Sequence, residues 1–171
     1  MLHNGIMEFR IGSGYDVHRL VTGRSLVLCG VSIPSDVGEE AHSDGDVALH
    51  ALCDALLGAL ALGDIGKWFP DTSAQYKDIN SRELLRTVYT HIASLGWDIA
   101  NVDLTILLQT PKLRPYIEEM RATIAADINC SLERVSVKAT TTERLGFVGR
   151  GEGIAAEAVV LLTKASTTRS L

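Results

Sequence analysis

The segment from about Gly45 to Leu62 constrains the fold more than any other part of this 171-residue chain, because it reads as a helix that is apolar almost all the way round. Such a helix must be buried on most sides by a sheet or by other helices. Only Asp46, His50 and Asp54 interrupt it, each four positions after the last. They form one polar stripe, and a polar stripe on a buried helix needs partners.

The other predicted elements surround this helix. Apolar alternation and turn residues predict strands at 9–20, 25–33, 97–109, 135–139 and 154–162, a loop at 34–40, and helices at 81–95 and from Pro115 onward. A capping-box-like Ser43-x-x-Asp46 is expected to open the first helix. The order β-β-α-α-β-α-β-β indicates an α/β (α+β) sandwich, with one mixed sheet covered by helices.

Composition narrows the class of protein. The net charge of −5 does not favour nonspecific binding to nucleic acid or to an anionic membrane. The three cysteines are odd in number and lack CxxC spacing, which argues against a disulfide framework or a thiolate metal site. The longest apolar run, 55–62, is far shorter than the roughly 20 residues of a membrane span. We expect a cytoplasmic protein with a single catalytic domain at 1–171, an ordered core at about 9–164 and frayed termini at 1–8 and 165–171.

Three side chains of metal-binding type lie in the first strand and the apolar helix. Asp16 and His18 are two residues apart in the strand, so they point to the same side. His50 could supply a third donor, and Asp46 and Asp54 could orient its second ring nitrogen. Three protein ligands and one open position are typical of catalytic zinc. Two histidines and a carboxylate also describe a non-haem iron site, which stays the alternative, although the usual order there is His-x-Asp followed by His.

A second polar region begins where the strand 135–139 ends. Three threonines, Thr140 to Thr142, offer hydroxyl and backbone N–H groups to phosphate oxygens, and Glu143 is an oxygen donor suited to magnesium or manganese. The glycines that follow precede a strand, so they are not a dinucleotide-binding fingerprint. The connection 109–113 lies between a strand and a helix, where backbone groups can contact a base and a lysine can meet a phosphate. Glu157 interrupts an apolar strand, which favours a dimer or trimer seam there.

Several ungapped motifs together resemble the family of 2-C-methyl-D-erythritol 2,4-cyclodiphosphate synthases. They are GYDVH at 14–18, AHSDGDVALH at 41–50, LGDIG at 62–66, FPD at 69–71 and the block 138–153, within a similarity that spans about 10–164. The resemblance implies a homotrimer with active sites between neighbouring subunits, in the non-mevalonate route to isoprenoids. The implied reaction closes 4-diphosphocytidyl-2-C-methyl-D-erythritol 2-phosphate to the cyclic diphosphate and releases CMP. The alternatives are a non-haem iron oxygenase and a non-catalytic nucleotide-binding trimer.

The resemblance also implies roles for individual residues. Asp16, His18 and His50 would bind one zinc ion per subunit, and Glu143 would bind a magnesium or manganese ion at the diphosphate. The implied catalytic residues, which would position and stabilise the reacting phosphates, are His42 and Thr141. The implied substrate contacts are Ser43, Asp64, Gly66, Phe69, Asp71, Leu108, Pro111, Lys112, Leu113, Thr140, Thr142, Phe147 and Arg150. Two positions near the base depart from the family pattern, which has alanine and an apolar residue where this chain has Leu108 and Arg114.

Overall fold

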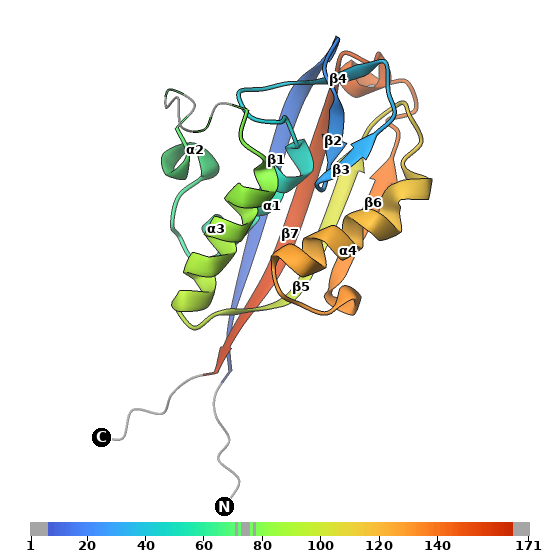
Figure 1. Cartoon of the computed structure of the whole chain (residues 1–171). Helices are drawn as coiled ribbons and strands as arrows, with labels where there is room; N and C mark the ends of the chain where they lie inside the picture. Colours follow the sequence, from blue (N-terminus) through green and yellow to red (C-terminus); the bar gives the residue numbers. More distant parts are fainter. Residues whose placement is uncertain (1–6, 71, 73–75, 77, 166–171) are drawn as a thin grey trace, which may run out of the picture.

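The centre of the fold is a five-stranded mixed sheet in the order β4-β1-β7-β5-β6 (Figure 1). This computed structural model describes residues 7–70, 72, 76 and 78–165. The strands are β1 (Met7–Thr22), β4 (Val37–Glu40), β5 (Asp98–Leu107), β6 (Val135–Thr140) and β7 (Gly153–Ala165). β5 and β6 pair in parallel, and the other pairs in this sheet are antiparallel. The predicted mixed sheet with helices is confirmed.

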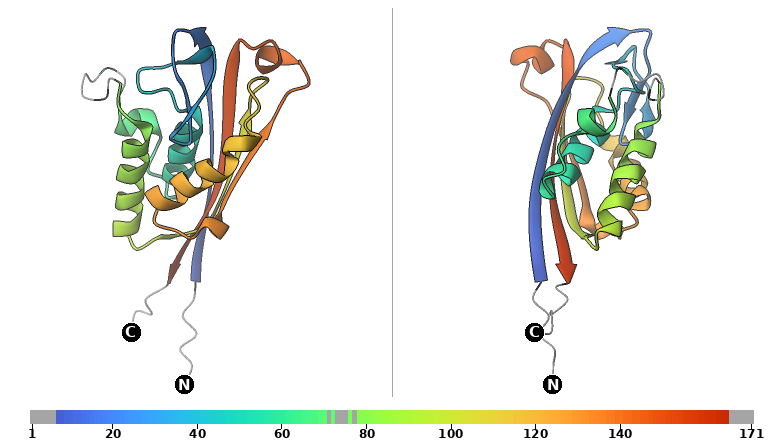
Figure 2. Two further views of the ribbon diagram at one scale, coloured as in Figure 1. Left: turned by 45° about the vertical axis from the view of Figure 1, so that its right-hand side comes forward. Right: turned by 90° about the vertical axis from the view of Figure 1, so that its left-hand side faces the viewer.

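Three helices cover one face of this sheet. The edge-on view in Figure 2 places α1 (Val47–Ala59), α3 (Ser81–Ser94) and α4 (Ile117–Asp127) on the same side of the strands. The structure also contains the short helices α2 (Ile65–Trp68) and α5 (Gly146–Gly149) and the 3-10 turns η2 (Arg114–Tyr116) and η3 (Leu132–Arg134). The sequence pattern did not predict these short elements because they hold too few residues to show a period. No helix in the described part of the chain is long and apolar enough to cross a membrane.

Helix α1 lies directly on β1, and two glycines make this approach possible. A methyl group on Gly12 would come within 1.9 Å of the carbonyl oxygen of Ala55, and one on Gly14 within 2.0 Å of that of Ala51. Neither position can therefore hold a side chain while the helix keeps its place. Because His50 directly precedes Ala51, the same contact places His50 beside Asp16 and His18, the next residues of β1 that point toward the helix.

Two predictions about the segment that follows β1 were wrong. Residues 25–33 are not one strand but a separate hairpin of β2 (Leu26–Leu28) and β3 (Val31–Ile33). Cys29 and Gly30 turn this hairpin with φ values of 52° and 75°. The predicted loop at 34–40 contains β4, which pairs with the end of β1. Strands of three or four residues are too short for alternation to identify them.

The ends of two long elements also differ from the prediction. The N-cap of α1 is Asp46, whose side chain accepts a hydrogen bond from the backbone N–H of Leu49, so the predicted capping box at Ser43 was wrong. The helix ends at Ala59, three residues before the predicted end. Residues 7, 8 and 165, expected in frayed termini, belong to β1 and β7. The rest of the predicted frayed ends lies outside the described residues.

The face of the sheet opposite these three helices is apolar along β1 and exposed. Alternate residues of β1 point to this side, and their large apolar side chains are exposed: Phe9, Ile11, Tyr15 and Val17, joined by Val159 of β7. Ile11 is 73% exposed. Glu157 of β7 pairs with Tyr15 in the sheet register and is also exposed. A contiguous apolar surface of this kind is typical of a protein contact.

Candidate metal centre and adjacent cavities

Asp16, His18 and His50 converge at one point between β1 and α1. The two-residue spacing in β1 puts Asp16 and His18 on the face that α1 covers, as the sequence predicts. The Asp16 Oδ2 atom lies 3.2 Å from His18 Nε2 and 3.2 Å from His50 Nδ1. All three side chains keep a small exposed fraction, between 12% and 29%. A ligand can therefore reach this point from solvent.

The spacing of these atoms fits a tetrahedral divalent ion. Metal–nitrogen and metal–oxygen bonds of about 2.0–2.1 Å at tetrahedral angles put neighbouring ligand atoms about 3.3–3.4 Å apart. The two distances of 3.2 Å are close to this value, and one ligand atom from each residue lies within 4.8 Å of the others. Two imidazole nitrogens aimed at one carboxylate oxygen from different elements fit a divalent metal site with room for a further ligand.

The outer ring nitrogen of His18 faces two acceptors. Its Nδ1 atom lies 2.7 Å from Glu39 Oε2 and 2.9 Å from the carbonyl oxygen of Gly45. Nδ1 therefore carries the hydrogen, and Nε2 is the nitrogen that faces Asp16. The sequence pattern gives Glu39 no role, because only the pairing of β4 with β1 brings it behind His18.

The outer ring nitrogen of His50 has different partners from those predicted. Asp46 accepts hydrogen bonds from three backbone N–H groups and Asp54 from another, so the prediction that these carboxylates orient His50 was wrong. Instead, His50 Nε2 lies 3.0 Å from Ser81 Oγ, which donates a hydrogen bond to Asp44. An i,i+4 stripe drifts by about 40° per step, which turns its ends toward different neighbours.

Charge holds this cluster together when no ion is bound. Burial acts to raise the pKa of Asp16, but the hydrogen bonds and positive charges of His18 and His50 lower it well below its usual range. Burial acts to lower the pKa of His18, but Asp16 and Glu39 outweigh it and raise that pKa to about 10. Burial raises the pKa of Glu39 to about 7, against the effect of His18. A metal ion must therefore displace a proton from His18 at neutral pH.

A cavity of about 390 Å³ opens beside the three ligands. His18 and His50 lie in its wall, and the rest is mostly apolar: Ala41, His42, Ser43, Ile65, Gly66, Phe69, Pro70, Tyr76, Ile79 and Leu84. The sequence motifs single out His42, Ser43, Gly66 and Phe69 but not Tyr76 or Leu84. Leu84 belongs to the apolar stripe of its helix, and Tyr76 follows a polar segment in which no pattern marks it.

Arg24 holds the loop that supplies His42 and Ser43 to this cavity. Its guanidinium donates hydrogen bonds to the carbonyl oxygens of Glu39 at 3.3 Å, Ala41 at 3.2 Å and Ser43 at 3.2 Å. Within the loop, Ser43 Oγ accepts from the backbone N–H of Gly45 and lies 3.1 Å from His50 Nε2. One arginine therefore fixes the backbone on both sides of His42.

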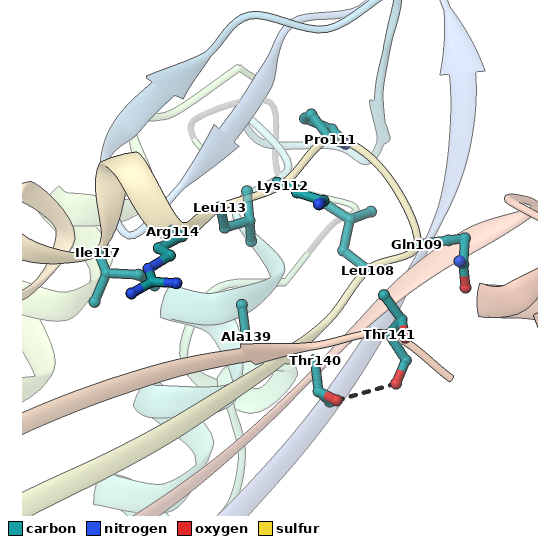
Figure 3. A pocket seen from close by; sticks show the side chains of 10 residues that line it. All are labelled: Leu108, Gln109, Pro111, Lys112, Leu113, Arg114, Ile117, Ala139, Thr140 and Thr141. Carbon is teal, nitrogen blue, oxygen red and sulfur yellow. Dashed lines mark hydrogen bonds between the residues drawn. The ribbon is translucent and has the colours of Figure 1, made fainter. Parts of the chain in front are cut away.

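A second cavity, of about 290 Å³, lies at the carboxyl ends of β5 and β6. Figure 3 shows residues of the connection after β5 on one side and residues 139–141 on the other. The predicted substrate contacts among its lining residues are Leu108, Pro111, Lys112, Leu113, Thr140 and the predicted catalytic Thr141. Gln109, Arg114, Ile117 and Ala139 complete the lining. Backbone groups, one lysine and one arginine thus surround a small and largely apolar hollow.

Other predicted site residues line neither cavity. Asp64 caps α2 by accepting a hydrogen bond from the Lys67 N–H. Thr142 donates to the carbonyl oxygen of Leu145, and Arg150 forms an exposed ion pair with Glu152. Phe147 is 37% exposed in α5. Asp71 lies outside the described residues.

Glu143 lies in the turn after β6, next to the second cavity. Its carboxylate is exposed, and Oε1 accepts a hydrogen bond of 3.1 Å from the hydroxyl of Thr141, which does line that cavity. Glu143 and Arg144 have positive φ angles of 52° and 65°, so the chain turns sharply here. The turn keeps the Glu143 carboxylate beside the hydroxyl of Thr141.

The two cavities open at the same end of the sheet but two strands apart. The register places Val17 of β1 beside Ala155 of β7, and Ala155 beside Leu107 of β5. Adjacent strands are about 4.8 Å apart, so β1 and β5 are separated by about 10 Å at this level. Among the described residues, none lines both cavities.

Solved structures of known proteins share this architecture. A solved structure of 2C-methyl-D-erythritol-2,4-cyclodiphosphate synthase in a bound form with CDP is 41% identical, with a TM-score of 0.83, over 90% of this chain and 99% of that one. The bifunctional IspDF of Campylobacter jejuni is 44% identical with a TM-score of 0.90, and the match covers 96% of this chain but only 44% of the longer protein.

Sequence relatives agree with the structural ones. A protein of Actinobacillus pleuropneumoniae serotype 7 (strain AP76), named 2-C-methyl-D-erythritol 2,4-cyclodiphosphate synthase, is 62% identical over 91% of this chain and 98% of its own length. The sequence profile of the YgbB family matches residues 9–163, which include all three metal-site residues and the lining of both cavities. The chain belongs to the YgbB family, whose members include the 2-C-methyl-D-erythritol 2,4-cyclodiphosphate synthases.

Proposed function

We propose that this chain converts 4-diphosphocytidyl-2-C-methyl-D-erythritol 2-phosphate to 2-C-methyl-D-erythritol 2,4-cyclodiphosphate and CMP, as a cyclising lyase of the non-mevalonate isoprenoid pathway. The observation that carries the proposal is the metal triad beside a mostly apolar cavity, in a chain 62% identical to a protein of that name. Both cavities then have an occupant: the methylerythritol phosphate lies beside the triad, and the cytidine lies in the hollow after β5.

The proposed cyclisation needs residues that bind and orient the phosphates of the substrate. The 2-phosphate must attack the β-phosphorus, so the barrier comes mainly from repulsion between anions and from geometry. A phosphate nucleophile is already ionised at neutral pH, so no general base is required. A zinc ion held by Asp16, His18 and His50 would supply Lewis acidity and a template for phosphate oxygens. His42 and Ser43, fixed by the hydrogen bonds of Arg24, supply donors to the same phosphate from the cavity wall.

The diphosphate requires a second set of groups. Glu143 supplies an oxygen ligand for a magnesium or manganese ion, and Thr141 and Thr142 supply hydroxyls beside it. We assign the methylerythritol to Asp64, Gly66, the aromatic wall at Phe69 and Asp71. Phe147 and Arg150 are assigned to the rim of the site, on the turn that follows Glu143.

The second cavity, which we assign to the cytidine, would bind the base through backbone groups and apolar contacts. Leu108, Pro111 and Leu113 form its apolar wall, and Thr140 lies opposite them (Figure 3). The ammonium group of Lys112 would meet a phosphate of the nucleotide. A relative solved in a bound form with CDP supports a cytidine nucleotide as the ligand.

We further propose that the chain acts as a homotrimer, with each active site between two subunits. Two observations support this. The β1 face opposite the helices is apolar and exposed from Phe9 to Val17, so a second copy would cover it. The two cavities of one chain are lined by different residues, so a neighbouring subunit can bring its cytidine cavity to the metal centre.

The reaction itself is tested by incubating the purified protein with the cytidylated substrate, zinc and magnesium, and by measuring CMP and the cyclic diphosphate. We expect equimolar release of both products, and loss of turnover after treatment with a chelator. Oxygen consumption without CMP would indicate an iron oxygenase instead. Tight nucleotide binding without turnover would indicate a binding protein.

Zinc affinity should rise with pH, because His18 must lose a proton when the ion binds. The raised pKa of about 10 means that this proton is present throughout the neutral range. Below that pH the affinity should increase about tenfold per pH unit, and it should level off above it. The test is best made between pH 7 and pH 8. Glu39 has a pKa of about 7, so its own loss of a proton affects the slope of zinc affinity against pH mainly near pH 7. Chelator competition measures the affinity, and a flat profile would contradict the expectation.

A further inference from the structure

We propose that Glu39 is a positioning residue of the metal centre, which fixes the ring of His18 with Nε2 toward the ion and so sets how tightly the ion is held. The inference rests on the proposed function only for the identity of the ion as zinc. It assigns a role to a residue that no sequence motif marks, in a strand that the sequence pattern did not predict.

The geometry determines which ring nitrogen of His18 keeps its hydrogen when a metal ion binds. Glu39 Oε2 lies 2.7 Å from His18 Nδ1, and the second neighbour of Nδ1 is the carbonyl oxygen of Gly45 at 2.9 Å. Both neighbours accept, so Nδ1 keeps its hydrogen and donates, and Nε2 is the nitrogen that can bind a cation once it has lost its own proton. The strand pairing keeps this contact in place, since Glu39 lies opposite Leu20 in the β1–β4 register.

Glu39 occupies a place that is costly for a carboxylate. Its side chain is 0% exposed, and its Oε1 atom has no hydrogen-bond partner within the part of the chain that the structure describes. A buried charge that is incompletely paired destabilises a fold unless a partner offsets it. The contacts of the Glu39 carboxylate are with His18 and with the backbone N–H of Val47 at 3.1 Å, so among the described residues the metal ligand is the only side-chain partner of opposite charge that the carboxylate has.

A carboxylate behind a metal-binding imidazole acts on the ion in two ways. It holds the ring in the orientation that points the ligand nitrogen at the metal, and its negative charge makes that nitrogen a stronger donor. Loss of such a partner typically lowers metal affinity about 10- to 100-fold. Because Gly45 also accepts from Nδ1, we expect loss of Glu39 to weaken the site without abolishing it.

The test compares Glu39→Gln, Glu39→Leu and the control Glu40→Gln, all as full-length protein. The side chain of Glu40 is 65% exposed and is 3.9 Å from Arg19, away from the metal ligands. Zinc dissociation constants from chelator competition should rise about 10- to 100-fold in the two Glu39 variants and stay unchanged in Glu40→Gln. Unchanged zinc affinity in folded Glu39→Gln and Glu39→Leu would overturn the proposal.

A spectroscopic measurement separates positioning from mere support of the fold. In the zinc-loaded wild type, nitrogen-15 shifts should show His18 Nδ1 protonated and Nε2 bound to metal, with a strongly hydrogen-bonded Nδ1–H that weakens in Glu39→Leu. A His18 that binds zinc through Nδ1 would overturn the proposal even if both variants failed to fold. Weaker zinc binding in the variants, together with no CMP release by the wild type, would refute the proposed function and leave the role of Glu39 intact.

Discussion

Replacement of His50 by alanine is expected to remove bound zinc and CMP release together. His50 Nδ1 is one of the three ligand atoms, together with His18 Nε2 and Asp16 Oδ2, and a site left with two protein ligands holds zinc far less tightly. A bound metal ion typically contributes several kcal/mol to charge stabilisation in a transition state, so turnover should fall by about a thousandfold or more. Zinc content by mass spectrometry and CMP release by chromatography measure the two losses.

The fold should survive this change, which keeps the test interpretable. His50 lies at the edge of the cavity, and its removal breaks contacts with Ser81 and Ser43 that water can replace. A suitable control is His91→Ala on α3, a histidine whose ring packs against Trp68 and which belongs to neither cavity lining. The control should keep both zinc and activity. Full CMP release from zinc-free His50→Ala would contradict the role of the triad.

The parts of the metal centre that depend on local periodicity were predictable. Asp16 and His18 share a face because a strand repeats every two residues, and the apolar composition of 45–62 requires a buried helix that can carry His50 inward. The same reasoning failed for the partners of His50. The i,i+4 spacing puts Asp46 and Asp54 on one stripe, but backbone N–H groups from the β2–β3 turn and from α2 occupy these carboxylates.

The parts that depend on pairing between distant segments were not predictable from the pattern. Glu39 lies behind His18 only because four residues of β4 pair with the end of β1, and four residues are too few to show alternation. The cavity that we assign to cytidine combines the connection after β5 with residues of β6, two segments about thirty residues apart. The position of Gln109 to Leu113 between a strand and a helix indicated possible contacts to a base and a phosphate, but only the resemblance to a family brought this connection together with Thr140.

Two variants that are each inactive should regain activity when they assemble in one trimer. His50→Ala removes the metal centre, and Ala139→Trp should fill the cytidine cavity, because Ala139 is exposed in its lining and the hollow is only about 290 Å³. If each site combines the metal centre of one subunit with the cytidine cavity of the next, a mixed ring contains one interface at which both halves are intact. About one third of the sites in any mixed trimer should then be active.

Coexpression of the two variants with different affinity tags, followed by purification on both tags, isolates the mixed trimers. We expect CMP release per subunit of about one third of the wild-type value, while each variant alone stays near background. Separately assembled variants, mixed without subunit exchange, serve as the control and should stay inactive. Sites contained within single chains would give no recovery at all, because every chain in the mixture then has one broken half. Neither variant alters the exposed apolar residues of β1, so both should still assemble. A mixed oligomer of the expected mass that has no activity would show that the subunits assemble but do not share active sites.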